Sequence, residues 1–501
     1  MEKNEIDVKR LFALMLAVTL FMFGFELYTY YFSPKETPQK AAKREEVQSF
    51  PQLMLGSMRE SKKPVQIQTF DFGNFTLSVS SEGGKIVSLV DKKYSYNLIT
   101  DTEKKLNIYP LEVYTGNSNI DQKLNFSAYQ IVREGNTIVM AYSDGDVSLT
   151  KRLTYEGDYF KLSISSKGLS SPLYVLVGGH PKGDEFYTHS GPVLSIGGKV
   201  ERLDVGSIKG REFLSGDISF AGEESRYYFK GFVGKIPSVL IYKIGEDKDS
   251  LTLVEVSNPL IFYAGAKEYS RLKKIGLSDV IDYGTLKILV KPLFIFMYWI
   301  YEHLRSWVFS ILALTLLVRV FMFPLTYKST ISMMKLSELA PKMQEIREKY
   351  KEDPTKMQEE MMKLYSQVGF NPMSGCLPMI LQIPVFFALY KVLTITADLQ
   401  LASMLWIPSL SHKDPYYILP IIMGLTMIAQ QFISPNPDKT QNFMMYVSSV
   451  AFTFLFASFP AGLVLYWTFN NIFNMGQSYL IKEVLLKDRK KVKAEGKKKR
   501  K

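Results

Sequence analysis

Five apolar runs after residue 305 constrain the fold more than any other feature of this sequence. Each is long enough to cross a bilayer, where backbone N–H and C=O groups must be paired within a helix or a closed barrel. The predicted spans are 306–325, 376–397, 416–433, 443–459 and 461–481. Residues 66–280, in contrast, have the composition of a soluble protein. The sequence therefore predicts a mixed fold, a polytopic α-helical membrane protein that carries a large soluble insert.

Another apolar run lies near the N-terminus, at residues 11–32, directly after Lys9 and Arg10. A cleaved signal peptide would end in small residues, but bulky aromatic residues follow this apolar core. Aromatic side chains are typical of a membrane–water interface. We therefore interpret residues 1–32 as an uncleaved signal-anchor span, followed by a charged, turn-rich linker over 33–65.

The stretch at 286–304 is apolar but differs from the spans, because it contains Lys291 and Pro292 and ends in polar residues. Mixed charged and apolar faces are typical of a helix that lies on the membrane surface. We predict an interfacial amphipathic helix within residues 281–305.

Positive charge in short loops predicts orientation, because Lys and Arg accumulate on the cytoplasmic side. Residues 326–375 contain eight Lys/Arg, and the tail over 482–501 contains eleven against three Asp/Glu. Six spans place both segments and the N-terminus in the cytoplasm, and 33–305 outside. If 286–304 also crossed the bilayer, the N-terminus and the basic tail would lie on opposite sides. We therefore predict six spans with both termini cytoplasmic.

Residues 66–280 alternate short strand-like runs with turns rich in Gly, Asp and Asn. Apolar residues recur there at every second position, which is typical of strands with one buried face. This alternation is clearest at Phe75, Leu77 and Val79 and at Leu162 and Ile164. Many short strands at close spacing indicate an antiparallel β-sandwich.

Enzymatic chemistry finds little support in the sequence. His180 and His189 flank Asp184 and Glu185 in "GGHPKGDEFYTHS", but no second motif accompanies them, and we interpret them as polar loop residues. The four histidines lack the spacing of zinc ligands. The single cysteine, Cys376, excludes an intramolecular disulfide. We predict no catalytic residue, no metal site and no cofactor.

Residues 327–368 change to helical periodicity. One predicted stripe is Leu339, Met343, Ile346 and Tyr350, and the next is Met357, Met361, Leu364 and Val368. Pro354 interrupts the pattern, with Asp353 as the candidate N-cap. Two helices with matching apolar stripes and a short connection predict an antiparallel hairpin on the cytoplasmic side. Its methionines are suited to contact a partner.

Arg319 lies within the predicted span 306–325, six residues before its end. The rise of a helix places it about 9 Å from the cytoplasmic end. An arginine at bilayer depth costs roughly 2.5–3.5 kcal/mol on insertion scales and about 10–17 kcal/mol in simulations of isolated helices. Two interpretations are open. The side chain snorkels to the headgroups, or it lies in a water-filled cavity that opens to the cytoplasm.

Polar residues in the other spans favour the cavity. Thr315 is one turn from Arg319 on the same helix face. The other candidates are Gln382, Gln430, Gln431, Tyr466, Trp467, Asn470 and Asn471. Each alone is typical of a helix–helix hydrogen bond, but together they can line one polar concavity. No carboxylate lies deep in these spans. We therefore predict that Arg319 is a hydrated positive charge available to an anion.

Several motifs of the chain resemble those of the YidC family of membrane protein insertases, in its bacterial six-span form. The matching motifs are "LVRVFMFPLT", "APKMQEIREKY", "NPMSGCLPMILQIPVFFALY", "DPYYILPIIMGLTM" and "FPAGLVLYWTFNN". Their order and spacing extend the resemblance over nearly the whole chain. It implies a five-span insertase core over 306–481 and a periplasmic β-supersandwich with no known catalysis.

The resemblance also implies a function. Such a protein inserts nascent transmembrane helices into the cytoplasmic membrane and helps them to fold, alone or with the Sec translocon. Arg319 and Thr315 match residues of the family's hydrophilic groove, and Tyr466 and Trp467 match an aromatic pair that contacts substrate. Expected partners are nascent membrane proteins, the Sec translocon, the ribosome and anionic lipids, with no DNA.

The basic tail is expected to contact the ribosome or anionic lipid, because runs of Lys and Arg bind phosphate. The candidate residues are Lys490, Lys491, Lys497, Lys498, Lys499 and Arg500. The alternative is a tail that only sets the topology.

Two other functions are open at this point. A secondary transporter could use Arg319 to bind an anionic substrate, although the sequence has no inverted repeat or second intramembrane charge pair. An assembly factor could work mainly through its outer sandwich.

Overall fold

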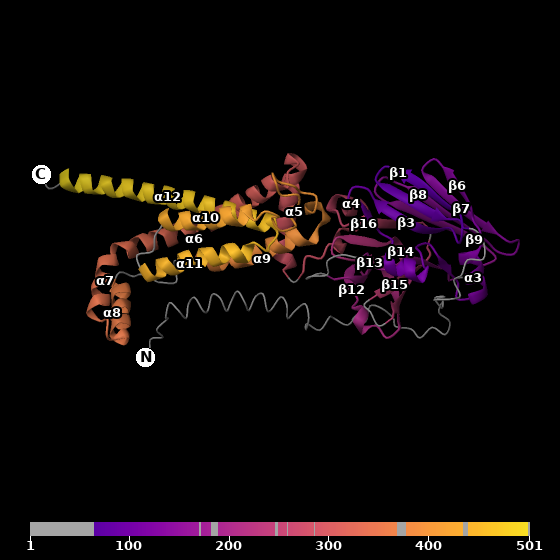
Figure 1. The fold of residues 1–501 in the computed structure, drawn as a ribbon, viewed down its shortest axis with the longest axis horizontal. Helices are drawn as coiled ribbons and strands as arrows, with labels where there is room; N and C mark the ends of the chain where they lie inside the picture. The colour runs from indigo at the N-terminus through magenta and orange to yellow at the C-terminus, as the bar shows by residue number, and fades with distance from the viewer. Residues whose placement is uncertain are drawn as a thin grey trace. The chain divides into compact units, whose positions relative to one another are not determined.

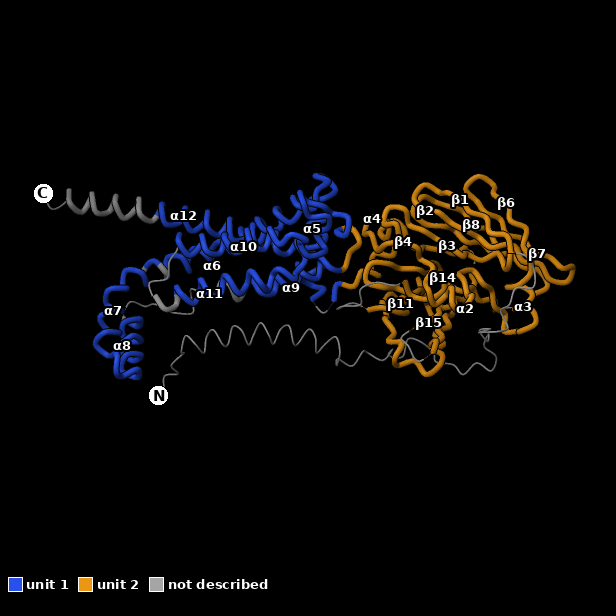
Figure 2. Tube along the Cα trace, viewed as in Figure 1, with its two compact units in different colours: residues 1–23, 283–394, 399–501 blue, residues 24–282, 395–398 orange. Residues whose placement is uncertain are grey.

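The computed structural model describes residues 65–498, except 170–171, 182–188, 246–248, 258, 285, 368–376 and 434–438. The predicted signal anchor, nearly all of the predicted linker, and the loop residues Asp184 and Glu185 lie outside this range. Two compact units are distinguished in Figure 2. Within the described residues, unit 1 comprises 283–394 and 399–498, and unit 2 comprises 65–282 and 395–398.

Unit 2 is built from antiparallel strands in two sheets (Figure 1). The first has the order β1-β2-β3-β4. Its strands are β1 Ile67–Phe72, β2 Phe75–Ser80, β3 Lys85–Asp91 and β4 Tyr96–Asn97. The second has twelve strands, nine of them in the order β12-β11-β13-β14-β16-β9-β8-β7-β6. Beside this path, β10 pairs with β15 and β5, and β15 also pairs with β14.

The bounds of the larger sheet follow the chain. Its strands are β5 Val113–Tyr114, β6 Gln130–Glu134, β7 Thr137–Ser143, β8 Ser148–Tyr155, β9 Phe160–Lys167, β10 Tyr174–Gly178, β11 Gly191–Ile196, β12 Lys199–Arg202, β13 Arg211–Glu224, β14 Tyr228–Ile244, β15 Asp249–Glu255 and β16 Leu260–Ala266. The short helices of this unit are α2 Asp101–Leu106, α3 Ser118–Phe126, η2 Val205–Ser207, α4 Tyr269–Lys274 and η3 Ser278–Val280.

The core of unit 2 confirms the predicted alternation. Phe75, Leu77 and Val79 of β2 are buried, as are Leu162 and Ile164 of β9, and all five belong to one apolar cluster. The intervening residues of β2 are less buried, as period-two alternation requires. A large antiparallel β unit is therefore present, as the sequence predicts.

Several ionisable groups inside unit 2 are buried with polar partners. Lys151 Nζ donates hydrogen bonds to the carbonyl oxygens of Gly83, Gly84 and Leu111 at 2.7, 3.1 and 2.6 Å. Lys230 Nζ lies 2.6 Å from Glu103 Oε1, and both side chains are fully buried. Removing one member of such a pair leaves an uncompensated buried charge, so these contacts constrain how the sheet and α2 pack.

Glu223 is a buried carboxyl that should make the stability of unit 2 depend on pH. Ser250 Oγ and Thr252 Oγ1 donate to it at 2.9 and 2.6 Å, and burial raises its pKa from 4.5 to about 8. The folded state therefore binds the proton more tightly than the unfolded state. The contribution of the protonated Glu223 carboxyl to the stability of unit 2 is complete below pH 4.5 and is lost as the pH rises towards 8.

We predict that Glu223→Gln flattens this pH dependence, because glutamine does not titrate. Amide hydrogen exchange of β13 and β15 in the full-length protein, corrected for intrinsic rates, measures local stability across this pH range. The exposed-site variant Glu134→Gln is the matched control and should keep the slope. An unchanged slope in Glu223→Gln would assign the pH dependence to another group.

Unit 1 is helical. Its elements are α5 Lys287–Leu304, α6 Trp307–Glu338, α7 Ala340–Lys349, α8 Pro354–Gln367, α9 Leu377–Ile395, α10 Ile418–Ile433, α11 Lys439–Phe456 and α12 Ala461–Lys498. The 3-10 turn η5 Ala397–Leu399 follows α9, and its first two residues belong to unit 2. In unit 1, α12 packs against both α6 and α10, and α10 packs against α11. The predicted helical core is therefore present.

The boundary between the second predicted span and the hairpin differs from the prediction. We expected the span to end at 325 and the hairpin to begin at 327, but α6 continues unbroken to Glu338. Pro324 marks the predicted end, yet a proline inside a helix removes one hydrogen bond without always ending the helix. The antiparallel pair consists of α7 and α8 only, which are in contact with each other.

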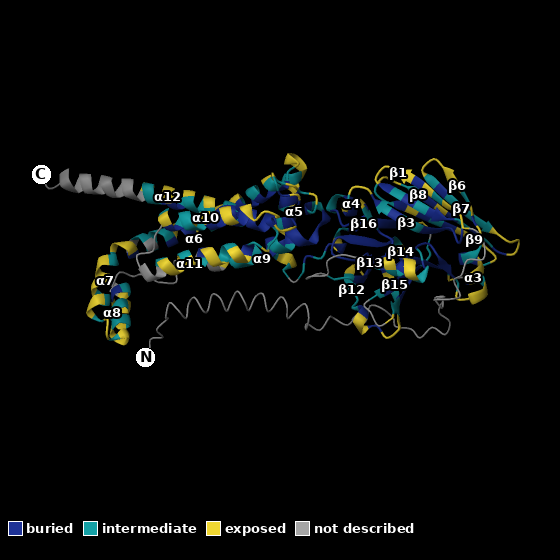
Figure 3. Ribbon diagram, viewed as in Figure 1, coloured by how far each residue is buried: buried dark blue, intermediate teal, exposed yellow. Residues whose placement is uncertain are grey.

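One described helix, Trp307–Glu338, has both the length and the hydropathy to cross a membrane. The shorter apolar stretches are Leu381–Ile395, Ile418–Ile433 and Asn442–Phe456. The count of six spans therefore stays a prediction. Large apolar side chains are exposed on several of these helices, among them Phe321, Phe432 and Phe454. Figure 3 shows exposed residues along the helices of unit 1. Exposed apolar surface of this kind is typical of contact with lipid or another apolar partner.

Candidate functional site: a polar cluster around Arg319

Arg319 is buried between α6 and α12, with 8% of its surface exposed. Its Nη1 donates to Asn474 Oδ1 at 3.0 Å, and its Nη2 donates to the carbonyl oxygen of Asn470 at 2.8 Å. Both acceptors are neutral, and Arg319 forms no ion pair with any residue that the structure describes. The guanidinium charge is thus held in place without being neutralised.

We predicted that Arg319 is a hydrated positive charge, and its hydration stays a prediction. The side chain is largely enclosed by protein and makes two direct hydrogen bonds. Its Nε is buried and has no partner among the described residues.

Asn474 and Gln477 are site residues that sequence reasoning missed. Gln477 Nε2 donates to the carbonyl oxygen of Arg319 at 3.5 Å. Asn470, Asn474 and Gln477 follow the spacing i, i+4, i+7, so they share one face of α12. This polar stripe inside an apolar helix was a readable signal, and it extends nearly two turns beyond the residues that we predicted.

Two predicted residues, Gln382 of α9 and Tyr466 of α12, form a direct hydrogen bond in which the Gln382 amide faces the buried Tyr466 hydroxyl. Trp467 does not join them. Its ring contacts Phe386 and Phe456 instead, with centroids 5.6 and 5.3 Å apart. The two residues of the predicted aromatic pair therefore have different surroundings, since Tyr466 has a polar partner and Trp467 packs against apolar rings.

The remaining candidates lie on three helices. Thr315 is buried and its hydroxyl donates to the Ile311 carbonyl of its own helix at 2.7 Å. Asn471 Nδ2 donates to Thr426 Oγ1 at 2.9 Å, which joins α12 to α10. Gln431 is buried near the end of α10. None of these three bonds to Arg319 among the described contacts.

Several buried polar atoms on the helices of unit 1 have no partner within the described part of the chain. Buried side-chain atoms with no partner among the described residues include Arg319 Nε, Thr326 Oγ1, Gln430 Oε1, Gln431 Oε1, Asn442 Oδ1, Asn470 Oδ1 and Gln477 Oε1. More than 90% of buried polar groups in native proteins have a partner, protein or water. Such a set is therefore expected to bind water or a polar guest.

In the helical pair, Met343 and Leu364 are buried together with Leu336, and Ile346 and Met361 pack against them. Tyr350 and Met357 do not belong to this apolar cluster. The ring of Tyr350 contacts Lys349, and Met357 is half-buried. Val368 lies outside the described residues.

Of the tail candidates, Lys490, Lys491, Lys497 and Lys498 lie within α12, which ends at Lys498. Their side chains, together with Lys499 and Arg500, lie outside the described part of the structure.

The fold and this cluster define a class of protein: a helical membrane protein with a buried, uncompensated arginine and a large antiparallel β unit. A family described as 60Kd inner membrane protein matches residues 299–489, and one described as YidC periplasmic domain matches residues 252–296. The chain belongs to the YidC family of membrane protein insertases.

Two curated relatives show this membership directly. Membrane protein insertase YidC of Aquifex aeolicus is 52% identical over 500 residues, with 98% of this chain and 99% of the relative covered. Membrane protein insertase YidC of Wolinella succinogenes is 35% identical over 512 residues, with coverages of 94% and 95%. A solved structure of an active YidC insertase is 20% identical, with 82% of this chain and 94% of that chain covered and a TM-score of 0.42.

Proposed function

We propose that this chain inserts nascent transmembrane helices into the cytoplasmic membrane, and that the Arg319 cluster receives the polar flank of such a helix. The observation that carries the proposal is the pair of neutral acceptors on Arg319. Because these acceptors leave the charge uncompensated, an acidic group of the flank can bind it with a charge-assisted hydrogen bond. The unpaired side-chain oxygens of Asn470 and Gln477, two residues in contact with Arg319, can bind the rest of the flank or its water.

The physical problem is moving a short polar segment through hydrocarbon. A polar path that reaches part-way into the bilayer shortens the distance over which the flank is desolvated. The apolar helix of the substrate then leaves sideways into lipid, along apolar surfaces such as those of α9 and α11. Burial of its apolar surface supplies the driving force.

The proposal includes assistance with folding, alone or beside the Sec translocon, as in the family that the motifs resemble. It places both termini in the cytoplasm and unit 2 in the periplasm. The distribution of Lys and Arg supports this orientation, as does the match of residues 252–296 to the family's periplasmic domain.

Site-specific photocrosslinking to a ribosome-bound nascent chain tests this function. Probes at Thr315, Trp467 and Asn471 should crosslink to the polar flank of a substrate. These crosslinks should disappear once the substrate has been released into lipid. A probe at Phe321, which is mostly exposed on α6, should not capture the flank. Equal capture of the flank at Phe321 and at Thr315, Trp467 and Asn471 would contradict the proposed path.

We also propose that α7 and α8 contact the arriving segment through their methionines. Met343 is buried in the helical pair, while Met357 and Met361 are partly accessible. Flexible, polarisable methionine side chains adapt to varied apolar partners. Probes at Met357 and Met361 in the same experiment should crosslink before those of the Arg319 cluster.

The basic tail is proposed to bind ribosomal RNA or anionic lipid. Removing residues 487–501 deletes ten Lys/Arg, and we predict that it weakens ribosome binding with a marked loss of salt dependence, because released counterions drive such contacts. Sedimentation with ribosomes over a range of salt concentrations measures the slope. Binding that is independent of salt, or unaffected by the truncation, would leave the tail with a topology-setting role.

A further inference from the structure

Helix α5 has two apolar faces, and unit 1 covers only one of them. Val290, Phe294 and Met297 are fully buried. Ile288, Ile295 and Trp299 are 94%, 42% and 52% exposed and follow one another at helical spacing. A helix that needed only one buried face would carry polar residues at these positions. The exposed stripe therefore requires an apolar occupant.

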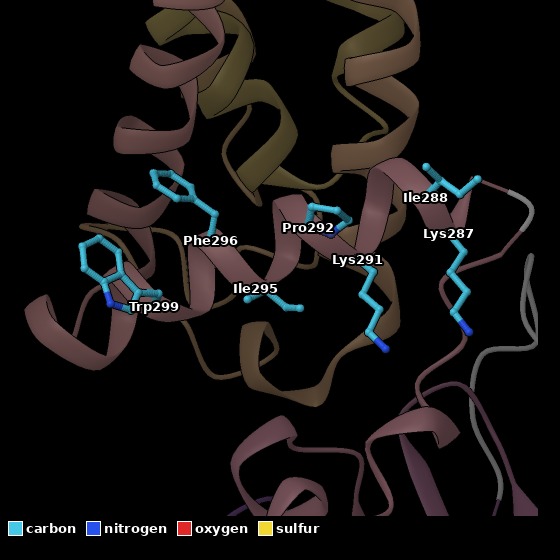
Figure 4. Close-up of a pocket in the computed structure, with 7 residues that line it drawn as sticks. All are labelled: Lys287, Ile288, Lys291, Pro292, Ile295, Phe296 and Trp299. Atoms are coloured by element: carbon cyan, nitrogen blue, oxygen red, sulfur yellow. The ribbon is translucent and has the colours of Figure 1, made fainter. Parts of the chain in front are cut away.

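This face forms an open pocket of about 780 Å³ (Figure 4). Its lining residues are Lys287, Ile288, Lys291, Pro292, Ile295, Phe296 and Trp299. Lys287 and Lys291 extend to the same side of the helix, whereas Ile288 and Phe296 point to the other side. The pocket thus has a cationic edge and an apolar floor. Its occupant should have an anionic part joined to a long apolar part.

We propose that this face binds an anionic phospholipid, with the phosphate at Lys287 and Lys291 and an acyl chain along Ile288, Pro292 and Ile295. The proposal rests on the proposed function only in placing unit 1 in a bilayer. Ammonium groups bind phosphate as point charges, so two of them one turn apart favour an anionic over a zwitterionic headgroup. Lys291 Nζ also lies 5.8 Å from the Tyr283 ring centroid, which holds the Lys291 side chain on this edge.

Trp299 defines the orientation of the helix. It lies twelve residues after Lys287, which is about 18 Å along the axis. Indole rings prefer the headgroup level, where lysines also lie. With anchors of this kind at both ends, α5 lies along the membrane surface rather than across it. Glu302 follows Trp299 and would repel a phosphate, so the headgroup binds at the lysine end.

Fluorescence quenching of Trp299 by brominated lipid tests the proposal in the full-length protein. The protein is placed in phosphatidylcholine bilayers that contain a series of increasing small mole fractions of either brominated phosphatidylglycerol or brominated phosphatidylcholine. The difference between the parent protein and Trp299→Phe isolates the signal of this residue from the other three tryptophans. No nascent chain is present, so a failed result here leaves the insertase function untouched.

We expect brominated phosphatidylglycerol to quench Trp299 at a lower mole fraction than brominated phosphatidylcholine. A lysine near an anionic surface contributes about fivefold in affinity, so the two together give about 30-fold. The double variant Lys287→Glu/Lys291→Glu should abolish this preference. Lys287→Arg/Lys291→Arg should keep it, since arginine also binds phosphate. The control Lys199→Glu/Lys209→Glu makes the same charge change at exposed sites of unit 2 and should keep the preference.

Three results would overturn the proposal. Equal quenching by both lipids in the parent protein would show an apolar face without headgroup selection. A preference that survives Lys287→Glu/Lys291→Glu would place the anion elsewhere. Absence of quenching by either lipid would show that protein, such as a second copy or a partner helix, covers the face.

Discussion

Replacing Arg319 by alanine is expected to reduce the insertion of substrates with acidic flanks by about tenfold to a hundredfold. This range follows from the loss of one hydrogen bond between charged groups, which contributes about 1.5–3 kcal/mol. Insertion of matched substrates with neutral flanks should fall much less, because they do not use the charge. The measurement is the initial rate of insertion into proteoliposomes for the two substrates side by side.

Lysine at position 319 separates charge from geometry. The guanidinium binds two acceptors on α12, at Asn470 and Asn474, and lysine cannot span both in the same way. If the charge is what matters, Arg319→Lys should keep much of the activity on acidic flanks. If the forked geometry matters, it should fail about as badly as alanine. Full activity of Arg319→Ala on acidic flanks would remove Arg319 from the mechanism.

The sequence predicted which elements exist more reliably than where they end. The period-two alternation at Phe75, Leu77 and Val79 predicted the β unit, because half-buried strands must alternate. The start of the hairpin, in contrast, was predicted at 327, whereas α6 continues through Pro324 to Glu338. Whether a helix continues past a proline depends on the tertiary packing around it, which is not visible in a local pattern.

The candidate site was predictable in its residue types but not in its connections. An arginine and several amides inside apolar runs stand out in the sequence, because polar residues are costly in a membrane and therefore rare there. Which atoms bond is not visible, because Arg319 and Asn474 are 155 residues apart. The buried pair of Lys230 and Glu103 in unit 2, 127 residues apart, was unpredictable for the same reason.

Changing Asn474 to aspartate is expected to have an effect on acidic-flank substrates similar to that of Arg319→Ala, although Arg319 is still present. The two side chains have nearly the same shape, so the variant changes charge and little else. Asn474 Oδ1 already accepts from Arg319 Nη1 at 3.0 Å, and a carboxylate there would form an ion pair with the guanidinium. Because Arg319 is buried and Asn474 is half-buried, breaking this ion pair would leave a largely desolvated charge without a partner, which is unfavourable. An acidic flank would then find no uncompensated charge.

Two comparisons decide whether the negative charge introduced by Asn474→Asp acts through Arg319. Asn474→Ala removes the acceptor but leaves the guanidinium uncompensated, so it should be less harmful on acidic flanks than Asn474→Asp. Asn136→Asp makes the same chemical change at an exposed turn of unit 2 and should be neutral. In the double variant Asn474→Asp/Arg319→Ala the two effects should not add, because each change alone already abolishes the same uncompensated positive charge, one by pairing it and the other by removing it. Additive losses would mean that Asn474 and Arg319 act on separate steps.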